Sequence, residues 1–130
     1  MTRICLDTSA YGLLMRGDVG LRTRLEEADE VLLPVTVLGE LHAGFRMGSR
    51  REENLAGLNA FLNEGGVRIV PTTDNVAERY GVLVQQLRER GTPIPTNDIW
   101  IAAAVLETGA RLIAYDAHFR CVMGVLVESP

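Results

Sequence analysis

The chain has 130 residues, the length of one ordinary domain, and 47% of them are hydrophobic, so its composition excludes an intrinsically disordered protein. The formal net charge of −4 does not favour a general binder of polyanions, although acidic side chains around a metal ion can create a locally positive field. All 13 basic residues are arginine, which excludes a lysine nucleophile or P-loop lysine and leaves side chains suited to bidentate contact with phosphate.

Along the chain, short apolar segments alternate with segments of helical periodicity. The apolar segments are rich in Val, Ile or Leu and lack polar alternation, which is typical of strands buried on both faces. In chain order the sequence predicts a strand over Arg3–Leu6, helices over Thr8 to about Arg16 and Asp18–Ala28, a strand over Glu30–Leu33, helices from Pro34 to about Met47 and over Asn54–Asn63, a strand over Val67–Val70, helices over Thr73–Arg90 and Asn97–Thr108, and strands over Arg111–Ala114 and Val125–Val127. This order indicates one α/β domain, residues 1–130, with a parallel sheet, helices on both faces and right-handed connections.

Neither the cysteines nor the apolar segments indicate an extracellular or membrane protein. Cys5 and Cys121 have no metal-type spacing and form no disulfide framework, so we expect two reduced thiols. No apolar run approaches the ~20 residues of a membrane span. A strand and an aspartate begin almost at once in place of a signal peptide. We therefore expect a cytoplasmic protein with no membrane contact.

Three aspartates stand where an apolar segment meets a turn or a helix start. Asp7 follows the first strand, Asp116 follows the fourth, and Asp98 opens the last helix. The carboxyl ends of parallel strands lie along one edge of a sheet, so we expect these side chains to lie close together. Two like charges about 4 Å apart cost on the order of 4 kcal/mol at an effective dielectric near 20. A hard cation such as Mg²⁺ would offset that repulsion.

Each of these aspartates also has a structural explanation. Asp7 can serve in a turn or as a helix cap, although Thr8 or Ser9 can equally cap the first helix, and Asp116 can be a turn aspartate. For the last helix the cap can come from Thr96 or Asn97, so capping does not require Asp98. At helical spacing Asp98 shares a stripe with the apolar residues Ile101, Ala102 and Val105. An inward-facing carboxylate is costly unless it has a partner, which favours a functional role for Asp98.

Glu40 is ambiguous from the sequence alone. Val35, Leu38, His42 and Phe45 form one apolar face of the third helix, and we expect His42 to lie in the core or in an interface. Glu40 lies on the opposite side, where a solvated glutamate would give the same pattern.

Four short motifs together resemble a known family. They are Leu6-Asp7-Thr8-Ser9, Gly39-Glu40-Leu41, Thr96-Asn97-Asp98-Ile99-Trp100-Ile101-Ala102-Ala103 and Tyr115-Asp116-Ala117-His118-Phe119. Their order, their spacing and the length of the chain resemble the PIN-domain family, especially the VapC-like ribonuclease toxins of toxin–antitoxin pairs. The resemblance covers essentially the whole chain.

The resemblance implies a three-layer α/β/α sandwich with a central, mostly parallel five-stranded sheet, and a Mg²⁺- or Mn²⁺-dependent endoribonuclease. It implies metal binding by Asp7, Asp98 and Asp116, with Glu40 as the fourth catalytic acid, and hydrolysis of RNA by a metal-activated water. It also implies a homodimer and a cognate antitoxin that covers the active-site groove, with an arginine or similar cation against the acids. One departure is Ala114, where family members often carry Thr or Ser, so Asp116 lacks a supporting hydroxyl.

Other polar residues complete the predicted site. Thr8, Asn97, Arg46 and Arg50 are candidate substrate-binding residues; Arg46 and Arg50 belong with Arg51 to a basic segment that can instead be a solvated helix connection. We expect His118 to be a surface turn residue and Trp100 to serve in packing or a dimer contact.

Two rival functions remain. A phosphotransfer domain with Asp7 as nucleophile is disfavoured, because haloacid-dehalogenase-like phosphatases carry a second Asp where this chain has Ser9, and receiver domains need a late lysine. The other rival is a catalytically silent PIN-like module that only binds RNA or protein.

Overall fold

The five strands form a single parallel sheet in the order β3-β2-β1-β4-β5. The computed structural model describes residues 1–130, with strands β1 (Arg3–Leu6), β2 (Glu30–Pro34), β3 (Val67–Val70), β4 (Arg111–Ile113) and β5 (Val127–Glu128). In the centre of the sheet, Cys5 of β1 pairs with Leu32 of β2 on one side and with Leu112 of β4 on the other. The predicted five-stranded sheet is confirmed, and all of its pairings are parallel.

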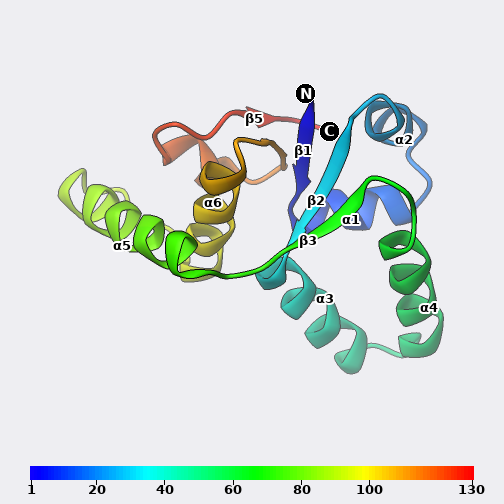
Figure 1. Ribbon diagram of the computed structural model, residues 1–130. Coiled ribbons are helices and arrows are strands. Elements are labelled where there is room, and N and C mark those ends of the chain that lie inside the picture. Colours follow the sequence, from blue (N-terminus) through cyan, green and yellow to red (C-terminus); the bar gives the residue numbers. More distant parts are fainter.

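Six α-helices and one short 3₁₀ helix connect the strands. They are α1 (Thr8–Met15), α2 (Val19–Glu26), α3 (Val35–Met47), α4 (Arg51–Leu62), α5 (Asp74–Glu89), α6 (Thr96–Thr108) and η1 (Ala117–Cys121). Figure 1 shows α1, α2 and α4 on one side of the sheet and α5 with α6 on the other. Helix α3 leaves the end of β2 and contacts both α1 and α6, so it lies between the two helical layers at the carboxyl edge of the sheet.

Several predicted boundaries differ from the structure for identifiable reasons. Helix α4 begins at Arg51 rather than Asn54, and its first turn holds Glu52 and Glu53, which the helix dipole stabilises there. The last strand begins at Val127, because the backbone N–H of Val125 donates to Val122 in a turn and is not available to the sheet. Helix η1 was not predicted; it turns the chain between β4 and β5.

The core is one apolar cluster of 31 buried residues that contains the strands and the inner faces of the helices. Ala102 and Ala103 are fully buried in α6, and such small side chains let the helix lie close against the sheet. In α3 the buried residues are Val37 and Leu41, and Leu38 and Phe45 of the predicted apolar face are partly buried against the core. The predicted face is wrong at Val35 and His42, which are exposed. His42 is exposed and lies edge-on to Phe45.

Candidate acidic active site

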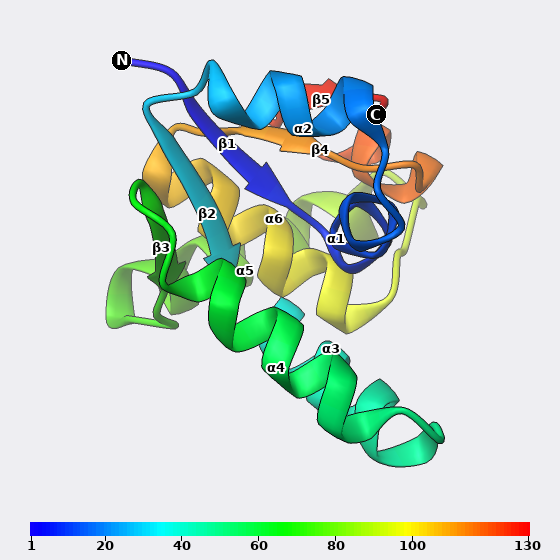
Figure 2. The ribbon, with the colours of Figure 1, turned by 90° about the vertical axis from the view of Figure 1, so that its right-hand side faces the viewer.

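The predicted acidic residues converge where the strand order reverses. From β1 the chain crosses to β2 on one side, while β4 joins β1 on the other, and the crevice between the carboxyl ends of two such strands is a preferred ligand site. Asp7 directly follows β1, and Asp116 follows β4. Helices α3 and α6 deliver Glu40 and Asp98 from the second turn of one helix and the first turn of the other. Figure 2 shows β1 running towards the start of α1, and Figure 1 shows β2 running into α3.

Asp7 is the buried member of this cluster, and it is the only polar or charged residue among the buried ones, with 5% of its surface exposed. Its Oδ1 accepts a hydrogen bond of 2.8 Å from the backbone N–H of Ala10, so Asp7 itself is the N-cap of α1 and the predicted caps Thr8 and Ser9 are wrong. Burial raises the pKa of Asp7 from 3.8 to about 6, against the lowering effect of the Ala10 hydrogen bond. The other three acids raise this pKa further, which places them within electrostatic reach of Asp7.

Asp98 lies in the first turn of α6 and is not needed as its cap. The N-cap is Pro95, which makes no side-chain hydrogen bond, so the predicted caps Thr96 and Asn97 are also wrong. The side chain of Asp98 is only 16% exposed, in line with the predicted inward direction. Burial raises its pKa, a hydrogen bond from His118 lowers it, and the charges of Asp116 and Glu40 raise it. Asp98 is therefore a second carboxylate whose charged form is disfavoured in the absence of a cation.

Glu40 is held towards the cluster by two predicted substrate-binding residues. The hydroxyl of Thr8 donates to Glu40 Oε1 at 2.7 Å, and Nδ2 of Asn97 lies at the long limit of a hydrogen bond, 3.5 Å from Oε2. These contacts join the start of α1, the second turn of α3 and the first turn of α6. In the structure Thr8 and Asn97 therefore orient an acid, a role that the sequence did not indicate.

Asp116 and His118 form the outer side of the cluster. Asp116 caps η1 by accepting a 2.9 Å hydrogen bond from the backbone N–H of His118. The imidazole Nδ1 of His118 lies 2.9 Å from Asp98 Oδ2 and 3.1 Å from Asp116 Oδ1. His118 is exposed, but it belongs to the site, which the expectation of a simple surface turn residue missed. Its position two residues after Asp116 was the available signal. Ala114 is buried, and no hydroxyl lies at its position.

The remaining predicted residues lie elsewhere. Arg46 lies roughly 9 Å further along the axis of α3 than Glu40, at 1.5 Å per residue, and Arg50 lies beyond the end of that helix. Both side chains are exposed, and Arg50 forms a solvent-exposed ion pair with Glu53. Trp100 stacks on Tyr80 with ring centroids 3.9 Å apart, which confirms a packing role.

The acidic cluster fits a hard divalent cation. Its donors are carboxylate oxygens, the preferred ligands of Mg²⁺ and Mn²⁺. The ligand atoms of Asp98, Asp116 and His118 lie within 4.8 Å of one another, and the pKa values of Asp7 and Asp98 are raised, first by burial and further by the charges of the neighbouring acids. A cation there would lower the cost of keeping all the carboxylates ionised.

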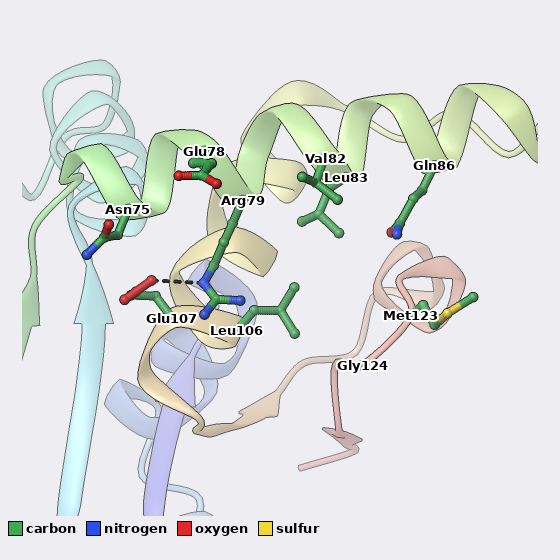
Figure 3. Close-up of a pocket in the computed structure, with 10 residues that line it drawn as sticks. All are labelled: Asn75, Glu78, Arg79, Val82, Leu83, Gln86, Leu106, Glu107, Met123 and Gly124. Carbon is green, nitrogen blue, oxygen red and sulfur yellow. Dashed lines mark hydrogen bonds and ion pairs between the residues drawn. The ribbon is translucent and has the colours of Figure 1, made fainter.

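A cavity of substantial volume lies away from this cluster. It has a volume of about 730 Å³ and lies between α5, the end of α6 and the turn at Met123 (Figure 3). Val82, Leu106 and Met123 line it together with a 2.8 Å ion pair of Arg79 and Glu107. None of the four acids lines this cavity, and its charged side chains include the ion pair of Arg79 and Glu107, so we place the chemistry at the acidic cluster instead.

None of the helices combines the length and apolar character needed to cross a bilayer.

Comparison with known proteins agrees with the fold and with the predicted family. Residues 4–123 match the PIN domain family, so the chain belongs to that family, as the four motifs indicated. Among curated relatives, ribonuclease VapC5 of Mycobacterium tuberculosis is 27% identical over 92% of this chain and 87% of its own length. Ribonuclease VapC2 of Rickettsia felis is 24% identical over 81% of this chain and 78% of its own.

Solved structures give the same result for the fold. VapBC2 from Rickettsia felis bound to a promoter DNA fragment superposes with a TM-score of 0.90 at 22% identity, covering 99% of both chains. A Mycobacterium tuberculosis structure of VapBC-5, a member of the VapBC family of toxin–antitoxin systems, has a TM-score of 0.74 at 27% identity and covers 99% of this chain and 98% of that one. The predicted three-layer PIN-like fold is therefore confirmed.

Proposed function

We propose that this protein is a metal-dependent endoribonuclease and the toxin of a toxin–antitoxin pair. The observation that carries the proposal is the convergence of Asp7, Glu40, Asp98 and Asp116 at the carboxyl edge of the sheet, with Asp7 buried and its pKa raised to about 6. Membership of the PIN domain family and curated relatives named as VapC ribonucleases support the same activity.

In this proposal Asp7, Asp98 and Asp116 hold a Mg²⁺ or Mn²⁺ ion. When bound, the ion supplies charge neutralisation, activation of water and stabilisation of the phosphate charge. Asp7 is a buried ligand in a fixed position, because burial and its hydrogen bond from Ala10 leave the carboxylate little freedom. Thr8 and Asn97 direct Glu40 into the cleft, where this carboxylate can accept a proton from the attacking water. Arg46 and Arg50 lie further out and contact the RNA backbone.

The proposal includes two partners, a cognate antitoxin and a second copy of the chain. Structures of VapBC family members support a small antitoxin as the cognate partner of this chain. We place the antitoxin over the acidic cleft, where an arginine can compensate the carboxylates as the ion does. We also propose a homodimer, and light scattering of the purified chain tests the oligomeric state. Co-purification with the product of a neighbouring reading frame, followed by loss of cleavage on its addition, tests the antitoxin.

The activity is tested with a structured RNA in the presence of Mn²⁺ or Mg²⁺, with and without EDTA. We expect cleavage that stops with EDTA and that falls by at least roughly 100-fold in Asp98→Asn, because this change removes a charged ligand. Asp74→Asn is the matched control, since Asp74 also lies in the first turn of a helix but is exposed and outside the cluster. Cleavage that ignores EDTA and Asp98→Asn would contradict the metal-nuclease proposal. RNA binding without any cleavage would favour the catalytically silent module.

A further inference from the structure

His118 is a nitrogen donor in a cluster that otherwise offers only oxygen. Its Nδ1 lies 2.9 Å from Asp98 Oδ2 and 3.1 Å from Asp116 Oδ1. The two aspartates come from different elements, α6 and the segment before η1, so the imidazole bridges two parts of the chain. Only one other histidine, His42, exists in the sequence, and it is exposed on α3.

The backbone holds this imidazole in place, although the side chain is 47% exposed. The backbone N–H of His118 donates to Asp116, which fixes the position of the residue relative to one of its two contacts. The next residue, Phe119, is 1% exposed and anchors η1 in the core. At the end of η1, Arg90 donates to the carbonyl of Cys121 at 3.2 Å. The imidazole is therefore presented to the acids by a fixed turn.

Hydrogen bonding does not explain both contacts of Nδ1. A ring nitrogen carries at most one hydrogen, and here it has two carboxylate oxygens from different residues at nearly equal distance. Only the contact with Asp98 has the geometry of a hydrogen bond, so a hydrogen bond does not account for the close contact with Asp116. A cation shared by the three atoms would give each of them a partner. Adjacent ligands of an octahedral ion with bonds of about 2.1 Å are about 3.0 Å apart, which matches the two observed separations.

We propose that His118 Nδ1 is a ligand of the ion that Asp98 and Asp116 hold, and that this nitrogen makes the site select Mn²⁺ and other transition-metal ions over Mg²⁺. The proposal rests on the metal-dependent function proposed above and adds the selectivity of the site. Oxygen donors suit Mg²⁺ and Mn²⁺ alike, whereas imidazole favours transition metals and Mg²⁺ rarely takes nitrogen ligands. His118 is thus a specificity-determining residue for the ion.

The test measures metal binding directly and needs no RNA. Mn²⁺ is added to the full-length protein, and electron spin echo envelope modulation looks for the ¹⁴N signal of a coordinated imidazole. We expect this signal in the wild type and in His42→Asn, and we expect it to disappear in His118→Asn. The Asn side chain retains a hydrogen-bond donor near the position of Nδ1, so it separates loss of ligation from loss of the contact with Asp98. Titration calorimetry should show Mn²⁺ affinity about tenfold lower in His118→Asn, with Mg²⁺ affinity little changed.

The outcomes distinguish the two proposals. Bound Mn²⁺ without a ¹⁴N signal, or equal losses of Mn²⁺ and Mg²⁺ affinity in His118→Asn, would overturn the role of His118 and leave the metal-dependent nuclease intact. A wild-type protein that binds neither ion, with Asp98→Asn behaving identically, would overturn both. A ¹⁴N signal that is lost only in His118→Asn supports the assignment even if the protein cleaves no RNA.

Discussion

Replacement of Asp7 by asparagine should stabilise the metal-free protein. In the native state the pKa of Asp7 is about 6, chiefly because the side chain is buried, against 3.8 for the ordinary group. Each pKa unit corresponds to 1.36 kcal/mol, so the ionised carboxylate costs at most about 3 kcal/mol of stability near neutral pH. Asparagine removes this charge but keeps an oxygen that can accept the hydrogen bond from Ala10 at the start of α1. Asp7→Asn should therefore gain up to about 3 kcal/mol in EDTA.

The pH dependence has a definite sign. Between about pH 4 and pH 6 the native state binds more protons at Asp7 than the unfolded state, so this group lowers the stability of the wild type as pH rises. The difference between Asp7→Asn and wild type should be near zero at about pH 4 and should reach its maximum above about pH 7. Because Trp100 is the only tryptophan, urea unfolding can be followed by its fluorescence at each pH.

Two further variants make the experiment specific. Asp7→Ala also removes the charge but loses the cap, so its gain should be smaller than that of Asp7→Asn by about 1 kcal/mol. Asp74→Asn changes an exposed aspartate in the first turn of α5 and should shift stability by less than about 1 kcal/mol, without the rise between about pH 4 and pH 6. If Asp7→Asn is no more stable than wild type near neutral pH, or if its gain does not depend on pH, the charge of Asp7 is not destabilising and the argument for a cation loses its main support.

Three other variants test the support of the site and the backbone. Thr8→Val removes the 2.7 Å hydrogen bond to Glu40, so RNA cleavage should fall roughly 10- to 100-fold at unchanged thermal stability; full activity would mean that this bond does not position Glu40. Gly109→Ala should destabilise the protein in urea by about 1–2 kcal/mol, because Gly109 ends α6 at a φ of 70°. Gly81→Ala, in the interior of α5 with open space around it, should stabilise it by about 0.5–1 kcal/mol, and equal effects of the two changes would refute the backbone explanation. Phe119→Ala should lower urea stability by about 3–5 kcal/mol if this ring anchors η1, and a loss below about 1 kcal/mol would exclude that role.

Local patterns in the sequence were sufficient for the order of the main elements and for three candidate acids, Asp7, Asp98 and Asp116, whereas Glu40 was identified only through the family resemblance. The strands are short apolar runs and the helices have apolar residues at helical spacing, so both were visible without the structure. Their exact ends were less predictable, because the end of a strand or helix depends on which distant backbone group is free to bond. The displacement of β5 to Val127–Glu128 is an example, since it follows from a turn bond between Val125 and Val122.

The roles of individual site residues were harder to predict from the sequence. Asp7 is at once a helix cap and a buried acid, and the sequence presented these as alternatives. His118 was missed because its significance depends on Asp98, which is twenty positions away and on another element. A histidine near an aspartate is common on protein surfaces, and only the packing of α6 against η1 gives this one a second carboxylate to contact.

The sequence by itself determined that acidic side chains follow strands and begin helices in a parallel α/β protein, because hydrophobic periodicity and chain position are local properties. Only the tertiary structure decided that β4 lies against β1 rather than at the other edge of the sheet, beside β3. A right-handed crossover can place a parallel strand on either side of the starting strand, depending on which face its helices cover, and no local pattern specifies that choice. The placement of β4 creates the crevice in which Asp7, Asp98 and Asp116 meet, so the site exists through long-range packing of segments that are each unremarkable alone.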